Sequence, residues 1–211
     1  MGRQISAKCK QCRREQQKLF LKGERCSTSK CALVKRSYIP GIHGPKLTRG
    51  VRLTGYGIQL REKQKAKRTY RLMEKQFRNY FEASIKKTGE TGDNLFNALE
   101  IRLDNTVYRA GFAPSRDLAR QAVTHGHFEV NGKKVDIPSY KIKVTDKISI
   151  KPKTQKGNMF ESLAETLKNK DIPDWLTVDA KELTFTVVGE PNIKKTPPQF
   201  DLKLIIEFYS R

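Results

Sequence analysis

The sequence lacks any long hydrophobic run and most of the motifs that mark enzymes. No segment approaches the roughly 20 consecutive apolar residues of a membrane-spanning helix. The opening residues, Met1–Cys9, contain no apolar stretch typical of a signal peptide, although Gly2 and Ser6 fit the loose pattern for myristoylation. Only three histidines are present, and there is no glycine-rich phosphate loop, nucleophile elbow or zincin motif. We therefore expect a cytoplasmic protein that is not an enzyme.

Acidic residues are scarce in the first part of the chain. Residues 1–80 contain 22 Lys and Arg but only four acids, which gives a net charge of +18 out of +21 for the whole chain. Residues 81–211 carry 21 basic and 18 acidic residues. Such an uneven charge is typical of a protein that binds a polyanion through one region, either nucleic acid or an anionic membrane. Residues 156–211, with eight bases and nine acids, suit contact with protein better than contact with RNA.

Cysteine occurs at only four positions, and all four lie within one short segment. Cys9 and Cys12 form one close pair, and Cys26 and Cys31 form a second pair after an intervening loop. This is the spacing of a closed, structural four-thiolate metal site, for which we favour zinc over an iron–sulfur cluster. Nearby basic residues are expected to lower the thiol pKa values and so to favour the metal-binding thiolates. The alternatives are two disulfides, which a cytoplasmic location disfavours, or four free thiols.

The segment after the cysteines combines chain breakers with a long basic helical pattern. Glycine and proline recur through residues 38–57, which predicts a linker, and a helical pattern with room for one break follows over residues 58–87. There the apolar side chains share one stripe and the cations share a different face. Because Glu74 is the only acid beside these cations, we expect them to contact phosphates. The charged face consists of Arg68, Arg71, Lys75 and Arg78. The basic residues among the first 80 positions that we assign to RNA binding are Lys8, Lys10, Arg13, Arg14, Lys46, Arg49, Arg52, Arg61, Lys63, Lys65, Arg68, Arg71, Lys75 and Arg78.

Residues 95–152 carry the most regular patterns of the chain. Apolar residues at helical spacing predict two helices, each followed by a glycine, and a serine is placed to cap the second. An Asn-Gly dipeptide between alternating segments predicts a hairpin, and further alternation predicts more strands. The elements are a helix from Leu95 that ends at Gly111, a helix over residues 116–125 capped by Ser115, a hairpin that turns at Asn131-Gly132, and strands within residues 140–150.

Basic side chains are expected to gather where the second helix meets the hairpin. Arg116 and Arg120 lie one helical turn apart, on a side of the helix largely different from its apolar side. Replacing both by alanine is predicted to weaken RNA binding by roughly 2–4 kcal/mol. The same change is predicted to leave thermal stability nearly unaltered, as most surface substitutions do.

The sequence of the last part of the chain predicts a short helix, a packed tryptophan and a final apolar segment. The short helix contains Leu163, and Trp175 precedes a strand. Apolar residues alternate over residues 202–208, so this segment is expected to pack on the basic helix of residues 68–87.

Several segments resemble the family of the fourth protein of the small ribosomal subunit. The central module alone is shared with tRNA synthetases, pseudouridine synthases and heat-shock proteins, whereas the flanking motifs are specific to the ribosomal family. The resemblance runs through essentially the whole chain, except that residues 187–199 do not match the usual family sequence closely. The similar segments are residues 102–112, 115–121 and 125–135 in the module, and residues 56–65, 74–80, 174–176 and 205–211 around it.

The resemblance implies a structural ribosomal protein that binds 16S ribosomal RNA early in subunit assembly and contributes to translational accuracy. It also implies a site at a multi-helix junction in the 5′ domain of that RNA. The implied neighbours are the fifth small-subunit protein and the path by which messenger RNA reaches the decoding region. The four cysteines match the branch of the family with a metal-binding knuckle, which implies one structural zinc ion. The residues that match the module's RNA-facing motif are Arg102, Arg116, Arg120, His125, His127, Lys133 and Lys134.

The predicted fold class is α+β, and the chain is expected to form three parts. An N-terminal metal knuckle precedes a mostly helical domain, into which a small α/β RNA-binding module of two helices and antiparallel strands is inserted. The predicted bounds are residues 1–44 for the knuckle and linker, 45–92 for the helical domain with 190–211 completing it, and 93–189 for the inserted module, whose core is 99–152.

Three other classes of function stay open at this point. An enzyme of the synthetase or synthase type needs a further domain, for which the chain has no room. A DNA-binding factor needs groove-reading helices and a dimerisation element, and the sequence shows no such element. The third class is a peripheral membrane protein that lies on the lipid surface through a basic amphipathic helix. Binding to vesicles without competition from RNA would favour this class.

Overall fold

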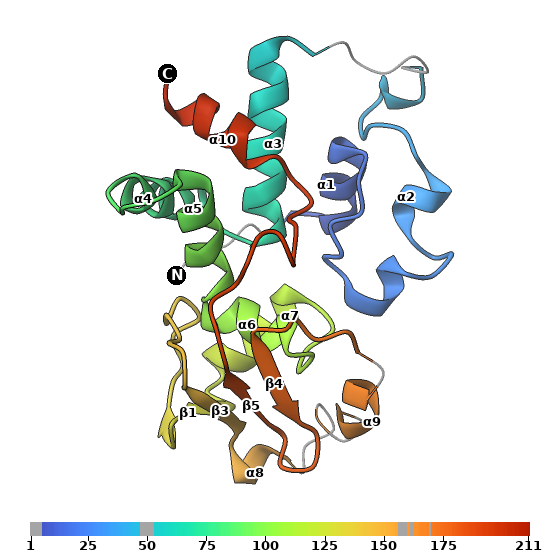
Figure 1. The fold of residues 1–211 in the computed structure, drawn as a ribbon. Coiled ribbons are helices and arrows are strands. Elements are labelled where there is room, and N and C mark those ends of the chain that lie inside the picture. Colours follow the sequence, from blue (N-terminus) through green and yellow to red (C-terminus); the bar gives the residue numbers. More distant parts are fainter. Residues whose placement is uncertain (1–5, 47–52, 156–159, 161–162, 169) are drawn as a thin grey trace. The chain divides into compact units, whose positions relative to one another are not determined.

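The computed structural model describes residues 6–46, 53–155, 160, 163–168 and 170–211, and the chain forms two compact units (Figure 1). Unit 1 contains Met1–Gly92 together with Pro198–Arg211, and unit 2 contains Asp93–Pro197. Unit 1 is therefore built from two segments that are far apart in the sequence. Among the described residues, no helix is long and apolar enough to cross a membrane.

Unit 1 is helical, and its longest predicted pattern is confirmed as two helices separated by one break. The first of them begins after Thr54, whose side-chain oxygen accepts a hydrogen bond of 3.2 Å from the backbone N–H of Gly57. This is the usual way in which a threonine caps a helix. The described helices of unit 1 are α1 (Lys8–Glu15), η1 (Gly23–Cys26), α2 (Ala32–Lys35), η2 (Gly44–Lys46), α3 (Gly55–Thr69), α4 (Glu74–Ile85) and α10 (Leu202–Tyr209).

The break between α3 and α4 divides the charged face that the sequence predicts. Arg71 adopts a left-handed conformation with φ of 57°, and its buried side chain donates a 3.1 Å hydrogen bond from Nη1 to Oε1 of Gln11. Arg68 lies on α3 and not on α4. Of the predicted face, Lys75 and Arg78 lie on α4, and both are exposed. The prediction of one continuous cationic face was wrong, because helical periodicity does not reveal a residue that reverses the backbone.

The last segment of the chain is a helix, not the alternating segment that the sequence predicts. α10 begins after Asp201, whose carboxylate accepts a 2.8 Å hydrogen bond from the backbone N–H of Lys203. It packs mainly on α3, and its Tyr209 ring stacks on Phe81 of α4 with a centroid distance of 4.6 Å. Buried residues therefore recur at helical spacing, as Leu202 and Ile205 do.

Glu74 connects α10 to the first two long helices. Its carboxylate accepts hydrogen bonds from Nζ of Lys63 at 2.6 Å, from Nζ of Lys67 at 2.9 Å and from the hydroxyl of Tyr209 at 2.9 Å. Burial opposes ionisation, but these hydrogen bonds outweigh it and lower the pKa of Glu74 to about 2. Burial and the bond to Glu74 raise the pKa of Tyr209.

Replacing Glu74 with glutamine is expected to remove a pH-dependent part of the stability of unit 1. The pKa of Glu74 in the folded protein, about 2, lies below the ordinary value of 4.5. The ionised carboxylate therefore contributes its full stabilisation above pH 4.5. This contribution is lost as the pH falls towards 2. The side chain is 45% exposed, and solvent screening reduces the effect to about 1 kcal/mol. Amide hydrogen exchange in α3 and α10, followed from neutral to acidic pH, measures it.

Glu82→Gln provides the matched control for this change. Glu82 forms an exposed pair with Arg78 on α4, with an N–O distance of 2.9 Å. This substitution should leave the pH profile of exchange unaltered. If Glu74→Gln and Glu82→Gln show the same decline of stability with falling pH, the hydrogen bonds to Glu74 do not hold unit 1 together.

Unit 2 surrounds one core with short helices and an antiparallel sheet, whose strands follow the order β2-β1-β3-β5-β4. The predicted hairpin is confirmed, since Asn131 and Gly132 join its strands with φ of 50° and 75°. The elements of unit 2 are α5 (Thr91–Glu100, which begins just before the unit boundary), α6 (Leu103–Arg109), α7 (Arg116–Thr124), β1 (Phe128–Val130), β2 (Lys133–Lys134), β3 (Lys147–Ile150), α8 (Pro152–Gln155), α9 (Leu163–Lys168), β4 (Leu176–Asp179) and β5 (Thr184–Val187).

Two predicted elements of unit 2 differ in the structure. The helix expected from Leu95 to Gly111 is divided into α5 and α6. The strand expected at residues 140–144 is replaced by an isolated bridge between Arg102 and Lys141. The two differences meet at Arg102, which is extended between α5 and α6 and forms this bridge. The cap of α7 is as predicted, with the hydroxyl of Ser115 accepting a hydrogen bond at its first turn.

Candidate nucleic-acid interface

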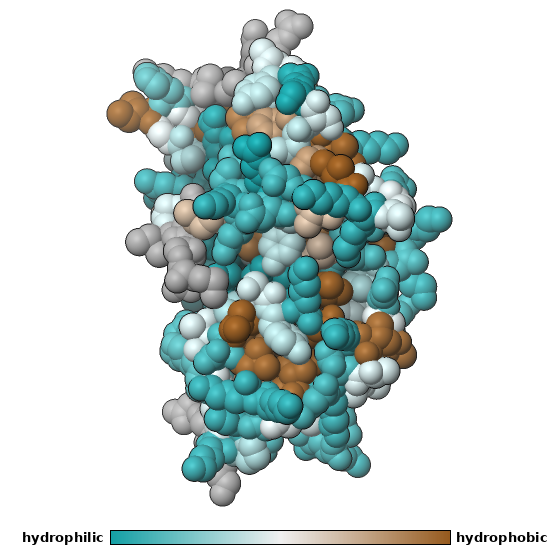
Figure 2. Space-filling view, turned by 90° about the vertical axis from the view of Figure 1, so that its left-hand side faces the viewer, coloured by the Kyte–Doolittle hydropathy of each residue, from teal (hydrophilic) through white to brown (hydrophobic). Residues whose placement is uncertain are grey.

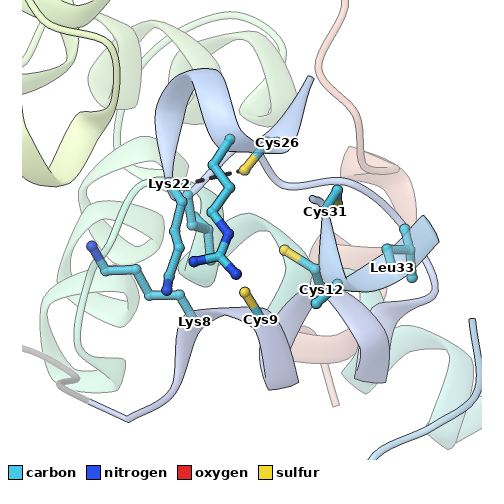
Figure 3. Close-up of a pocket in the computed structure, with 10 residues that line it drawn as sticks. Lys8, Cys9, Cys12, Lys22, Cys26, Cys31 and Leu33 are labelled. Atoms are coloured by element: carbon cyan, nitrogen blue, oxygen red, sulfur yellow. Dashed lines mark hydrogen bonds between the residues drawn. The ribbon is translucent and has the colours of Figure 1, made fainter. Parts of the chain in front are cut away.

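All four cysteines line one small pocket of unit 1 (Figure 3). Cys9 and Cys12 lie on α1, Cys26 ends η1, and Cys31 precedes α2. The pocket has a volume of about 20 Å³, which is roughly the space of one water-sized sphere. The backbone N–H of Lys22 donates a 3.3 Å hydrogen bond to the sulfur of Cys26. The four residues that the sequence predicts as one ligand set thus lie around one pocket.

The cysteines are free thiols, so the disulfide alternative does not apply to this structure. Burial raises the pKa of the Cys12 thiol, and the three other cysteines raise it further, contrary to the expected effect of the basic neighbours. Within the described parts of the chain, no three His, Cys, Asp or Glu side chains converge tightly enough to hold a metal ion. The zinc site therefore stays a prediction.

Several cations of unit 1 that were predicted to bind RNA are paired inside the protein instead. The side chain of Glu15 is only 1% exposed, and it accepts hydrogen bonds from Nη1 of both Arg61 and Arg68. Burial raises the pKa of Glu15, and the two arginines oppose that change. Lys63 is buried against Glu74, and Lys65 pairs with an acid one helical turn away. The prediction that Glu74 is the only acid beside the charged face was wrong, because Arg68 pairs with Glu15, which is distant in the sequence, and Arg78 pairs with Glu82.

The remaining cations of unit 1 have a more open setting. Arg13 is half-buried, with its guanidinium 4.6 Å from the centre of the Tyr38 ring and its Nε donating a 3.0 Å hydrogen bond to the Tyr38 carbonyl. Lys8 is also half-buried. The side chain of Lys46 and the whole of Arg49 and Arg52 lie outside the described residues. The predicted cations that the structure leaves exposed in this unit are Lys10, Arg14, Lys75 and Arg78.

A buried ion cluster in unit 2 contains two of the residues that were assigned to RNA. Asp104 accepts hydrogen bonds from Nε and Nη2 of Arg102, at 3.1 and 2.7 Å, and from Nη1 of Arg120 at 3.2 Å. All three side chains are almost completely buried. The assignment of Arg102 and Arg120 to an exposed RNA face was therefore wrong. α7 turns Arg120 towards α6, where the carboxylate compensates its charge, so replacing it by alanine should cost stability.

A second buried carboxylate positions Arg116 at the surface of unit 2. Glu100 is fully buried and accepts hydrogen bonds of 2.8 Å from Nε and Nη2 of Arg109. Asn105 donates its amide to Glu100 at 2.8 Å, and its oxygen accepts a 2.7 Å hydrogen bond from Nε of Arg116. The half-buried Arg116 also lies over the ring of Tyr108, at 4.5 Å from its centre. These supporting residues are not among those predicted from the sequence.

The hairpin end of unit 2 presents a separate group of cations. The rings of His125 and His127 lie 5.7 Å apart, and the side chain of Lys134 passes over Gly126, where no Cβ blocks it. His125, Lys133 and Lys134 are exposed. Burial lowers the pKa of His127, and the charges of His125 and Lys151 lower it further. Lys151 is not among the residues predicted for this group.

The predicted basic cluster is therefore divided between the two ends of α7. Arg116 is the first residue of this helix, and His125 follows its last residue. At 1.5 Å per residue, the two positions lie about 13 Å apart. A span of this size lets the two groups contact different phosphates of one nucleic acid. The face drawn in Figure 2 is mostly hydrophilic, with apolar patches among the polar side chains.

Comparison with known proteins gives full-length relatives. The family described as Ribosomal protein S4/S9 N-terminal domain matches residues 3–100, and the S4 domain matches residues 101–148. The small ribosomal subunit protein uS4 of Syntrophomonas wolfei is 49% identical over 211 residues, which is 100% of both chains. The corresponding uS4A protein of Alkaliphilus oremlandii is 51% identical and the uS4 protein of Acetivibrio thermocellus is 50% identical, again over 100% of both chains.

Proposed function

Since the chain belongs to the family of small ribosomal subunit protein uS4, we propose that it is a structural protein of the small ribosomal subunit that binds 16S ribosomal RNA and acts in translation, without catalysis. The observation that carries this proposal is the exposed group of His125, Lys133 and Lys134 at the hairpin end of unit 2. These residues lie within the segment that matches the S4 domain. Side chains of this kind bind phosphates and stack on unpaired bases.

Binding to a transcript of the 5′ domain of 16S ribosomal RNA is expected to depend steeply on salt. Roughly 6–10 phosphate contacts would lower the affinity by about 10³–10⁵ between about 50 and 200 mM salt. Lys133→Gln combined with Lys134→Gln should reduce the log–log slope by about 2, because each lysine neutralises about one phosphate. Filter binding over a salt series measures these slopes.

Three controls separate this function from its competitors. Lys181→Gln removes an exposed lysine at the β4–β5 turn and should leave the slope unchanged. Duplex DNA of equal length and anionic vesicles should not displace the RNA. Weak salt dependence, or equal affinity for RNA and duplex DNA, would reject the proposal.

We also propose that Cys9, Cys12, Cys26 and Cys31 hold one structural zinc ion. Three observations support this: the four residues line the same small pocket, their thiols are free, and a backbone N–H already faces one sulfur. Four thiolates close a tetrahedral coordination shell, so such an ion would stabilise the segment rather than catalyse a reaction. The segment has a small core of its own, Cys12, Leu19 and Leu21, which a bound metal would reinforce.

The family resemblance supports further proposals about place and partners. We infer a site at a multi-helix junction in the 5′ domain of the ribosomal RNA, with a role in nucleating assembly and in translational accuracy. The fifth small-subunit protein and messenger RNA near the decoding region are the proposed neighbours, and the ribosome in the cytoplasm is the proposed location. The nearly neutral charge of residues 156–211 supports contact with a protein in this part of the chain.

A further inference from the structure

Two cations of unit 2 lie over the same aromatic ring. The guanidinium carbon of Arg116 is 4.5 Å from the centre of the Tyr108 ring, and Nζ of Lys170 is 5.2 Å from it. Arg116 opens α7, whereas Lys170 follows α9. The fold therefore brings two positive charges together from distant parts of the sequence.

Both cations are held in place by the surrounding fold. Nε of Arg116 donates to the oxygen of Asn105 at 2.7 Å, and the amide of Asn105 is in turn bound by the fully buried Glu100. The stem of Lys170 lies against Gly111, where φ is 95° and a Cβ would approach Cδ of Lys170 to 3.0 Å. The two side chains are thus positioned before any ligand arrives, which reduces the entropy that binding must cost.

The surroundings of Lys170 disfavour its positive charge. Burial lowers the pKa of the Lys170 ammonium, and the charge of Arg116 lowers it further. Among the described residues, no carboxylate forms an ion pair with Lys170. Asp171 and Asp174 line the adjoining pocket, but Asp174 is paired with Lys195 at 3.0 Å. An ionisable group with a shifted pKa, held beside a second cation at the edge of a pocket, is a candidate for a binding site, and two positive charges suit an anion.

We propose that Arg116, Lys170 and Tyr108 form a binding site for one backbone phosphate of RNA, which adds Lys170 to the interface. This inference rests on the proposed function. The planar guanidinium and the ammonium can each bind a different oxygen of one phosphate, and both groups lie beside the ring of Tyr108. The adjoining pocket of about 250 Å³, lined in part by Tyr108 and Lys170, gives the ribose–phosphate chain room to approach.

The RNA arm of the test compares variants of Lys170 on the 16S 5′-domain transcript. Lys170→Gln is expected to weaken binding about tenfold and to reduce the log–log salt slope by about 0.9, the loss of one phosphate contact. Lys170→Arg should retain the slope, and Lys181→Gln should change neither quantity. If Lys170→Gln alters neither affinity nor slope while the Lys133 and Lys134 replacements do, this site is wrong and the proposed function stands.

The second arm uses inorganic phosphate without RNA. In the full chain, the side-chain NMR signal of Lys170 should shift and saturate as phosphate is added, and Arg116→Gln should abolish the shift. The signal of Lys181 serves as the internal reference. If Lys170 responds no more than Lys181, the anion site is overturned. If Lys170 responds but the chain does not bind the 16S transcript, the anion site remains, and both its RNA ligand and the proposed function are rejected.

Discussion

Replacing Asp104 with asparagine is expected to destabilise unit 2 by about 3–5 kcal/mol, the usual cost of breaking a buried ion pair by removing one partner. Asp104 is the carboxylate on which Arg102 and Arg120 converge, and both arginines are buried with it. Asparagine has nearly the same shape but no charge, so two buried guanidinium groups lose the negative charge of Asp104. The single tryptophan, Trp175, is buried in the same unit, so its fluorescence during denaturation reports the free energy of unfolding.

Glu182→Gln is the matched control for this change. It converts a carboxylate to an amide in the same unit, but Glu182 and its partner Lys147 are both exposed, with an N–O distance of 3.0 Å. Its effect should stay within about 0.5 kcal/mol. Equal effects of the two substitutions would show that the Asp104 cluster does not stabilise the fold. The exposed Lys133 and Lys134 should keep their contribution to RNA affinity under conditions where the Asp104 variant remains folded.

Removal of zinc is expected to unfold the cysteine segment while unit 2 remains folded. Structural zinc sites contribute about 10–16 kcal/mol of apparent binding free energy in isolated finger peptides, and the small core of this segment cannot replace it. Elemental analysis of protein purified without chelators should find about one zinc per chain. After chelation, amide exchange should accelerate in α1 and η1, while Trp175 fluorescence stays constant.

Two single substitutions at neighbouring positions test the zinc site. Cys26→Ser should lose the metal, whereas Ser27→Ala, at an exposed neighbouring position, should retain it. Protein that contains no metal, or four thiols that react freely at neutral pH, would contradict the zinc proposal. Loss of the Trp175 signal on chelation would instead show that the metal stabilises the two units together.

Local features of the fold could be predicted from the sequence because their causes are local. The cap at Ser115 needs one hydroxyl beside one helix start, and the turn at Asn131-Gly132 needs two residues that tolerate positive φ. The four cysteines were placed together because their spacing already defines two pairs. None of these predictions depends on which distant segment packs nearby.

Burial of the charged residues could not be predicted in the same way. Arg120 follows the spacing of an exposed stripe, yet Asp104 of the preceding helix draws it inward. Arg68 has a similar periodic position, and its partner Glu15 lies on α1. The position of Lys170 beside Tyr108 could not be predicted from the residues around Lys170, because Tyr108 lies on α6, far away in the sequence. Periodicity shows which residues share a face, but the partner that covers a face depends on the tertiary fold.

The composition of unit 1 from two separate segments sets an order of folding during translation. A ribosome produces α3 and α4 early, but it makes α10 only after every strand of unit 2. Unit 2 is continuous in sequence and can fold as a unit while the chain is still growing. Phe81 can stack on Tyr209 only after the last residues have been made. Unit 1, whose first segment is synthesised first, is therefore among the last parts of the protein to finish folding.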